Sequence, residues 1–290
     1  MQVMNIALIA ILLGIAATLL LNLGKGTSKF GLKQLGLRKD DKEGKRKYKI
    51  IWIGGIILTA SSVFVNIFAL DKGEASIIAS LAGVGITVLL IFSYFVLDET
   101  LEQIIYVGIA LTIGGTVVVA LFTSESHQIQ FNFINYWILF IIVLIPLLLG
   151  LVYCFKNEYK YFGFMFGAFA GFLAAFAVIL EKMGLILMGG VEYFLQSILT
   201  VGGFLFVIAL VLGLTATGFT QYGLTRGKAS ILVPAFNSCY IVIPVICEYL
   251  VFYTLLNLAQ IIGIVMILGG IVLMTAFKPE PLDVSPLDKN

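Results

Sequence analysis

The sequence predicts an all-α polytopic membrane protein with nine transmembrane helices in two inverted-topology repeats of four and five spans. Composition is the first reason, because 60% of the 290 residues are hydrophobic and only 12% are charged. The mean hydropathy is +1.08. A soluble domain usually carries about 25% charged residues, so most of this surface does not face water. The distribution of positive charge and an internal repeat are the other two reasons.

Nine apolar segments are long enough to cross a bilayer, whose core needs about 20 apolar residues per helix. They are too long and too uniformly apolar for the strands of a membrane barrel. We expect spans at 3–24, 50–70, 75–97, 104–122, 134–155, 161–180, 198–222, 229–252 and 255–277.

Lysine and arginine residues gather in the predicted loop 25–49, between the first two spans. Cytoplasmic loops are enriched in these residues, so we expect this loop inside, the N-terminus outside and the C-terminus inside. With nine spans, only Lys72 and Lys182 of the 18 lysine and arginine residues then fall outside. This predicts a multi-pass protein of the plasma or inner membrane. The basic loop is a topology signal, or it binds anionic lipid headgroups; its few aromatic residues argue against nucleic acid.

Two segments recur later in the chain. GEASIIASLA, from Gly73, matches GKASILVPAF, from Gly227, at an offset of 154. Residues 108–122 match 263–277 at an offset of 155, with Gly114 and Gly115 in register. Apolar helices also share residues by chance, but two matches at nearly one offset favour a repeat. The matched spans are five apart, and an odd displacement inverts their orientation, as in many secondary transporters.

The repeat divides the chain into a first half, 1–122, an external linker, 123–133, a second half, 134–277, and a cytoplasmic tail, 278–290, that we expect to be disordered. Within the sixth span, Gly163, Gly167, Gly171 and Ala175 form a stripe of small residues. Such a stripe lets another helix approach closely. It serves plain helix packing or, alternatively, a sliding surface.

These segments resemble the drug/metabolite transporter superfamily of EamA-like proteins, and within it most closely the NIPA-like magnesium transporter branch. The resemblance rests on ASIIASLAGVG ending in FVLDETL with Glu99, on GIALTIGGTVVVA, and on the second copy with Pro234. Asn66 matches an asparagine of that branch, whereas Ser80, Val63 and Tyr253 depart from its pattern. The resemblance implies a secondary transporter for a small solute, with magnesium or another cation as one substrate and an organic metabolite or drug as the alternative.

Polar residues in the spans give the candidate substrate-binding set: Asn66, Ser80, Thr217, Gln221, Asn237 and Glu248. Glu248 is the only charge inside a predicted span, where a carboxylate costs about 2.5–3.5 kcal/mol. It either faces a cavity or reaches the outer interface. Magnesium is usually held by one or two carboxylates and several waters, so Glu248 is the candidate metal ligand. The polar groups line a shared cavity, or they join helices to one another.

No enzyme motif is present, and we expect no enzymatic activity and no cofactor. His127, the only histidine, lies in a predicted outer loop. A passive channel and a non-transporting membrane protein are the alternative functions. The expected partners are the lipid bilayer and a small-molecule or ion substrate, and a homodimer with a second copy is an open alternative.

Overall fold

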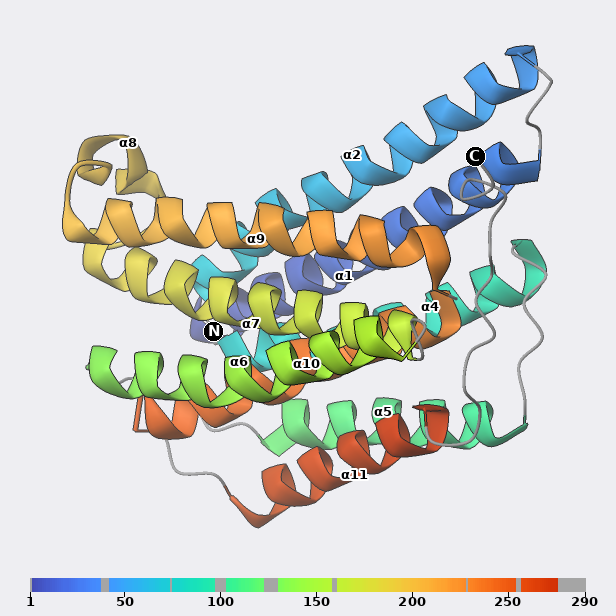
Figure 1. Cartoon of the computed structure of the whole chain (residues 1–290). Coiled ribbons are helices and arrows are strands. Elements are labelled where there is room, and N and C mark those ends of the chain that lie inside the picture. The colour runs from blue at the N-terminus through green and yellow to red at the C-terminus, as the bar shows by residue number, and fades with distance from the viewer. Residues whose placement is uncertain are drawn as a thin grey trace.

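The chain folds as a bundle of helices (Figure 1). The computed structural model describes residues 2–37, 42–73, 75–96, 103–122, 130–157, 161–227, 229–253 and 257–275. Throughout these ranges every regular element is a helix, which confirms the all-α fold class. In the same ranges six helices are long and apolar enough to cross a membrane: α1 (Gln2–Leu37), α2 (Lys42–Lys72), α6 (Phe133–Lys156), α7 (Phe162–Met188), α9 (Val201–Arg226) and α10 (Ala229–Leu250). These are the helices of a multi-pass membrane protein.

The remaining helices are shorter. They are α3 (Ala75–Ser80), α4 (Ala82–Val96), α5 (Gln103–Phe122), η1 (Val191–Tyr193), α8 (Phe194–Ser197) and α11 (Leu258–Thr275). The predicted span 75–97 is broken at Leu81, which forms a turn between α3 and α4. Glycine weakens a helix, and Gly83 and Gly85 follow the break directly. A side chain at Gly85 would collide with Thr18 and Asn22 of α1, so this glycine also permits close packing.

Two helices run well past their predicted ends. α1 continues from residue 24 to Leu37 and α2 begins at Lys42, so most of the segment expected as a loop at 25–49 is helical. α7 likewise continues from residue 180 to Met188. No proline interrupts the first of these extensions, and lysine is a good helix former. The predicted tail 278–290, Glu99 and His127 lie outside the described residues.

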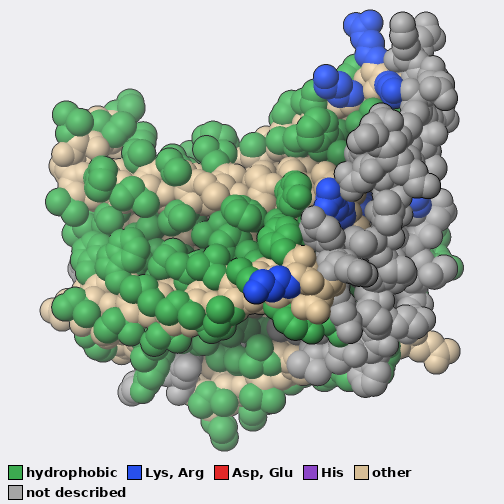
Figure 2. Space-filling model, in the orientation of Figure 1, with side chains coloured by type: hydrophobic (Ala, Val, Ile, Leu, Met, Phe, Trp, Pro, Cys, Tyr) green, Lys and Arg blue, Asp and Glu red, His purple; other side chains and the backbone are tan. Residues whose placement is uncertain are grey.

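The outer surface is largely apolar, as Figure 2 shows for one face. On α6, for example, Ile134 is 70% exposed and Leu149 is 65% exposed. In this view the basic side chains gather toward the end of the molecule where α1 ends and α2 begins (Figures 1 and 2). This arrangement suits helices surrounded by lipid with a basic rim at one membrane face.

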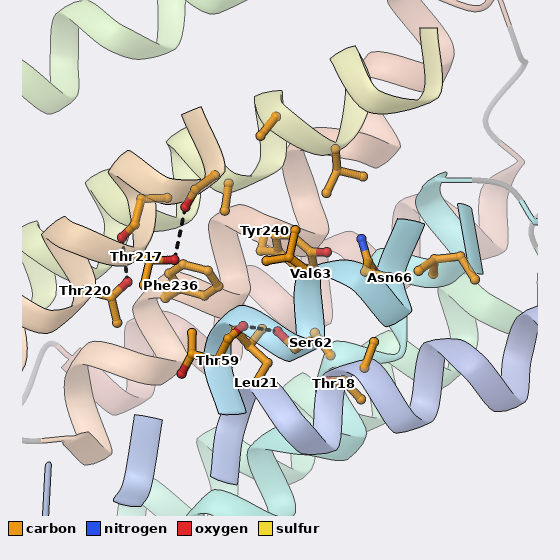
Figure 3. Close-up of a pocket in the computed structure, with 18 of the residues that line it drawn as sticks. Thr18, Leu21, Thr59, Ser62, Val63, Asn66, Thr217, Thr220, Phe236 and Tyr240 are labelled. Atoms are coloured by element: carbon orange, nitrogen blue, oxygen red, sulfur yellow. Dashed lines mark hydrogen bonds between the residues drawn. The ribbon is translucent and has the colours of Figure 1, made fainter. Parts of the chain in front are cut away.

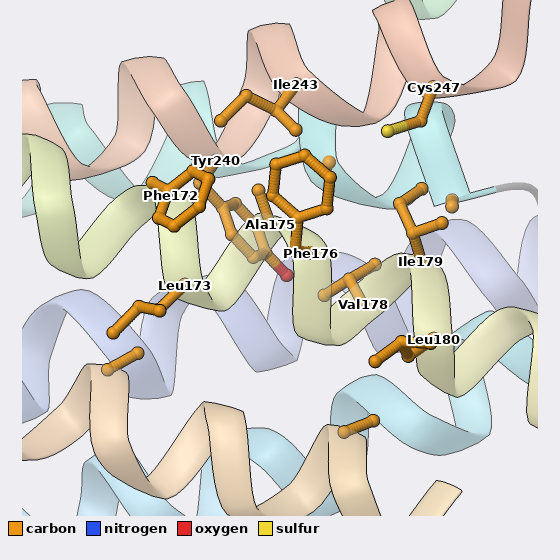
Figure 4. Packing of buried hydrophobic residues seen from close by; sticks show 14 of the residues in the cluster. Phe172, Leu173, Ala175, Phe176, Val178, Ile179, Leu180, Tyr240, Ile243 and Cys247 are labelled. Atoms are coloured by element: carbon orange, nitrogen blue, oxygen red, sulfur yellow. The ribbon is translucent and has the colours of Figure 1, made fainter. Parts of the chain in front are cut away.

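α7 and α10 form the centre of the bundle, and their side chains interlock in the main core (Figure 4). The small residues of α7 explain how closely the two helices pack. A Cβ atom on Gly167 would collide with the backbone of Leu232, and one on Gly171 with the backbone of Phe236. The predicted glycine stripe is therefore a helix-packing surface for α10.

Two lysines make matching contacts at the ends of other helices. Lys29 of α1 donates hydrogen bonds to the carbonyl oxygens of Leu224 (3.0 Å) and Gly227 (2.7 Å), where α9 ends. Lys182 of α7 donates to the carbonyl oxygens of Leu70 (2.7 Å) and Gly73 (2.9 Å), where α2 ends. Lysine side chains commonly satisfy the last carbonyls of a helix in this way.

α5 and α11 pack against each other along a glycine contact, and they run in opposite directions in Figure 1. A side chain at Gly115 of α5 would collide with the carbonyl of Gly263 in α11. One at Gly270 of α11 would collide with the carbonyl of Gly108 in α5. The backbones of the two helices are therefore in direct contact.

Candidate functional site

A cavity lies between the helices near the centre of the bundle, and Figure 3 shows its labelled wall residues. It offers about 70 Å³ to the centre of a water molecule. Residues of α1, α2, α3, α4, α7, α9 and α10 form the wall. Binding sites for small molecules are usually concave and mostly apolar, with a few placed polar groups, and this cavity has that character.

Four hydroxyl groups in the wall donate to carbonyls of their own helices. Thr59 donates to the carbonyl of Gly55 (2.9 Å), and Ser62 to that of Thr59 (2.6 Å). Thr217 and Thr220 of α9 donate to carbonyls one turn earlier in the same way. Because these protons are engaged, the hydroxyl oxygens can offer a ligand only acceptor positions in this state.

Lys25 of α1 is one of two charged side chains among the described residues of the wall. It is 1% exposed, and its Nζ atom has no hydrogen-bond partner among the described residues. The atom lies 3.0 Å from the centroid of the Phe236 ring on α10. A cation over an aromatic face is stabilised by the ring quadrupole, so Phe236 partly replaces the water that Lys25 has lost.

Glu181 of α7 is the other charged side chain in the wall, and it is 3% exposed. Within the part of the chain that the structure describes, no hydrogen bond or ion pair to its carboxylate is found, and none joins it to Lys25. Tyr240 lies close enough for the two groups to interact electrostatically, and Asn66 lies beside Tyr240 in the same wall. The cavity therefore holds an acid and a base that are not paired with each other.

Two of the predicted site residues line this cavity. Asn66 projects from α2 and Thr217 from α9, and both are labelled in Figure 3. Ser80 is the last residue of α3, and its side chain lies outside the described part of the structure. Side chains from the two predicted halves thus lie in the wall of one cavity, and substrate binding by them stays a prediction.

Two other predicted residues join helices and are not in the cavity wall. Gln221 accepts a hydrogen bond from the Trp52 indole (3.3 Å) and donates one to the Ser28 hydroxyl (3.2 Å). Asn237 donates to the Asn22 side chain (3.2 Å), which links α10 to α1. These contacts match the alternative interpretation that intramembrane polar groups hold helices together.

Glu248 also lies away from the cavity wall. It is 7% exposed and sits two residues before the end of α10 at Leu250. Groups of three or more His, Cys, Asp or Glu residues that could hold a metal ion are not found in the described ranges.

The sequence interpretation missed Lys25 and Glu181 for one shared reason. Each is the first residue after a predicted span, 3–24 and 161–180. An apolar run ends at a charged residue even when the helix itself continues. Both helices continue through the charge, to Leu37 and Met188. A usable signal was the apolar GLILMG that follows Glu181 and Lys182, which predicts a further turn of helix.

In comparisons with known proteins, no family model, no curated protein and no solved structure matches the chain.

Proposed function

We propose that this protein is a secondary transporter that carries a small solute through the central cavity by alternating access. The mirrored lysine contacts carry the proposal. Lys29 and Lys182 are 153 residues apart, and their acceptors are 154 apart, Leu70 with Leu224 and Gly73 with Gly227. Each bond crosses from one half of the chain to the other. A contact and its copy related in this way are what a pseudo-two-fold axis between inverted repeats produces.

The α5–α11 contact supports the same symmetry. Gly115 meets Gly263, and Gly270 meets Gly108. With the sequence offset of 155, Gly108 corresponds to Gly263 and Gly115 to Gly270. The contact is therefore reciprocal, as it is in a two-fold interface where residue i touches j and j touches i.

The cavity wall supports a binding site at the boundary between the repeats. Wall residues fall into pairs that share the offsets of 153 or 154: Leu21 with Ala174, Lys25 with Val178, Thr59 with Gly213, Ser62 with Ala216, Val63 with Thr217, Asn66 with Thr220 and Ala82 with Phe236. Transporters with inverted repeats hold their substrate near the midplane, between the halves.

The lysine contacts suggest how each end of the cavity is closed. Lys29 joins α1 to the end of α9, and Lys182 joins α7 to the end of α2. In Figure 1, α2 and α9 run in opposite directions, which places their C-terminal ends at opposite ends of the bundle. Breaking one contact while keeping the other opens the cavity on one side only, which is the requirement of alternating access.

Within the proposed drug/metabolite transporter assignment, Lys25 favours an organic solute over magnesium. A buried cation in the wall repels a divalent cation, and the low dielectric of the interior strengthens that repulsion. A passive channel is disfavoured by the contacts at both ends of the cavity, which would close a continuous pore.

Uptake into proteoliposomes tests the proposal. The purified protein is assayed with magnesium, amines, organic acids, amino acids and neutral metabolites, together with Glu181→Gln and Glu248→Gln. We expect saturable uptake of at least one solute, a loss of more than tenfold in Glu181→Gln, and little change in Glu248→Gln, whose side chain is outside the wall. The exposed Glu192→Gln is the control for the loss of one carboxylate. Uptake of none of the solutes by folded protein overturns the transport proposal.

A further inference from the structure

Resting on the transport function proposed above, we propose that the cavity binds a linear aliphatic zwitterion, an amino acid whose ammonium and carboxylate groups are separated by an apolar chain. Its carboxylate lies against Lys25 and its ammonium group against Glu181.

The first step is the state of Lys25. Its ammonium group is buried, has no hydrogen-bond partner among the described residues and lies over the Phe236 ring. A charge of this kind inside a membrane protein is expensive and usually marks a substrate or ion pathway. Phosphate and carboxylate groups are its natural partners. The carboxylate is favoured, because a single ammonium group suffices for it and the described wall residues include no second basic side chain.

The second step is the state of Glu181. Its carboxylate lines the same cavity, is nearly inaccessible to solvent and is unpaired within the described ranges. Tyr240 and Asn66 lie nearby and supply further oxygen atoms. An ammonium group with its three donors can bond to a carboxylate and to neighbouring oxygens together. A ligand that carries both charges therefore satisfies both buried groups in one event, and the occupied cavity is electrically neutral.

The third step concerns the distance between the charges. Lys25 lies one helical turn before Lys29, whose contact is at the end of α9, while Glu181 directly precedes Lys182, whose contact is at the end of α2. The two charges thus belong to different halves and lie toward opposite ends of the cavity. The wall also contains Leu21, Val63 and Val178. A chain of methylene groups between the ligand charges suits such a wall, and each buried methylene contributes about 0.8 kcal/mol.

The test measures binding to the purified protein in lipid nanodiscs by ligand-induced stabilisation against heat, which follows from preferential binding to the folded state. The probes are ω-amino acids from 3-aminopropanoate to 8-aminooctanoate, with the alkylamine and the alkanoate of each chain length. We expect affinity to pass through a maximum at one chain length. At that length the amino acid should bind at least tenfold more tightly than either singly charged analogue.

Two variants identify the partner of each charge. Lys25→Met should abolish the preference for the amino acid over the alkylamine, and Glu181→Gln the preference over the alkanoate. The matched controls, Lys72→Met and Glu192→Gln, remove like charges from exposed positions and should bind as the unaltered protein does.

The outcomes separate this inference from the proposal on which it rests. If an alkylamine or an alkanoate binds as tightly as every amino acid, the zwitterion is wrong, although uptake of that single-charge solute would still support a transporter. If no compound of the series binds while another solute is taken up by proteoliposomes, the zwitterion site is wrong and the transport function still holds. If neither binding nor uptake occurs with folded protein, the transport function falls as well.

Discussion

Lys25 and Phe236 show how a single pair of residues sets the chemistry of the cavity. The two side chains come from different halves of the chain, and the aromatic face takes the place of water around the ammonium group. In the proposed repeat their counterparts are Val178 and Ala82, which carry neither charge nor ring. A symmetric backbone of this kind would present different groups at equivalent positions and so fix the direction in which an asymmetric ligand binds.

We predict that Phe236→Leu lowers the stability of the protein, because leucine keeps much of the apolar volume and loses the aromatic face. The cation–π contribution is about 0.5–2 kcal/mol. Unfolding of the single variants and of the Lys25→Met/Phe236→Leu double variant gives the coupling energy. If the stability losses of the two single variants simply add in the double variant, the cation–π contact is contradicted.

At the scale of the helix, the glycines of α7 determine how closely α10 can pack. Gly171→Ala places a Cβ atom against the backbone of Phe236, which cannot move away as a flexible side chain can. Gly218→Ala on α9 is the matched control, since no atom lies within 4 Å of its new Cβ. Alanine there is favoured by helix propensity, by about 0.8–1.0 kcal/mol.

We therefore expect a clearly lower melting temperature for Gly171→Ala and an unchanged or higher one for Gly218→Ala. Thermal unfolding in the same detergent gives the melting temperature of each variant. Tryptophan fluorescence or aggregation reports the transition. Equal melting temperatures for the two variants would show that the α7–α10 backbone contact is looser than the structure has it.

The lysine contacts at the ends of α2 and α9 predict that two variants shift the protein toward opposite open states. Hydrogen bonds to a charged group contribute about 1.5–3 kcal/mol, and 1.4 kcal/mol corresponds to a factor of ten. Lys29→Met should shift the equilibrium between the two open states by about tenfold or more, toward the state open at the end where α1 ends and α2 begins. Lys182→Met should shift it toward the state open at the other end.

A cysteine at Thr217, in the cavity wall, reports the change when Cys154, Cys239 and Cys247 are replaced. Membrane-impermeant thiol reagents are applied to one side of oriented vesicles at a time. Lys29→Met should raise the labelling rate from one side and Lys182→Met from the other. If both variants raise labelling from the same side, the two contacts are not opposite gates.

The sequence predicted the helices far better than it predicted the site. Each predicted span is mostly helical where the structure describes it, although 75–97 is broken at Leu81 and α9 begins three residues later than predicted. Long apolar runs leave a chain in lipid few other ways to satisfy its backbone. Local composition could also identify the stripe of Gly167 and Gly171. It could not say that Asn237 bonds to Asn22, or that Lys25 lies inward, because these depend on contacts between helices far apart in sequence.

At the scale of the whole molecule, symmetry and topology constrain each other. α5 has 20 residues and α11 has 18. At about 1.5 Å per residue, the lengths of both helices approach the thickness of a bilayer core, which is about 30 Å. If these helices and the α3–α4 pair cross the membrane along with the six long helices, the chain crosses nine times. The two repeats are then five crossings apart and inverted.

An odd number of crossings places the two chain ends on opposite sides of the membrane, and the basic end of the first two helices favours the cytoplasmic side for the C-terminus. Fusing a reporter that is active only in the cytoplasm, and one that is active only outside, to each terminus measures this directly. We expect the N-terminal fusion to be active outside and the C-terminal fusion inside. Termini on the same side would mean an even number of crossings. If the missing crossing lay between the repeats, they would be four crossings apart and run parallel. Lys29 and Lys182 would then meet the same membrane face, contrary to their contacts at opposite ends of the bundle.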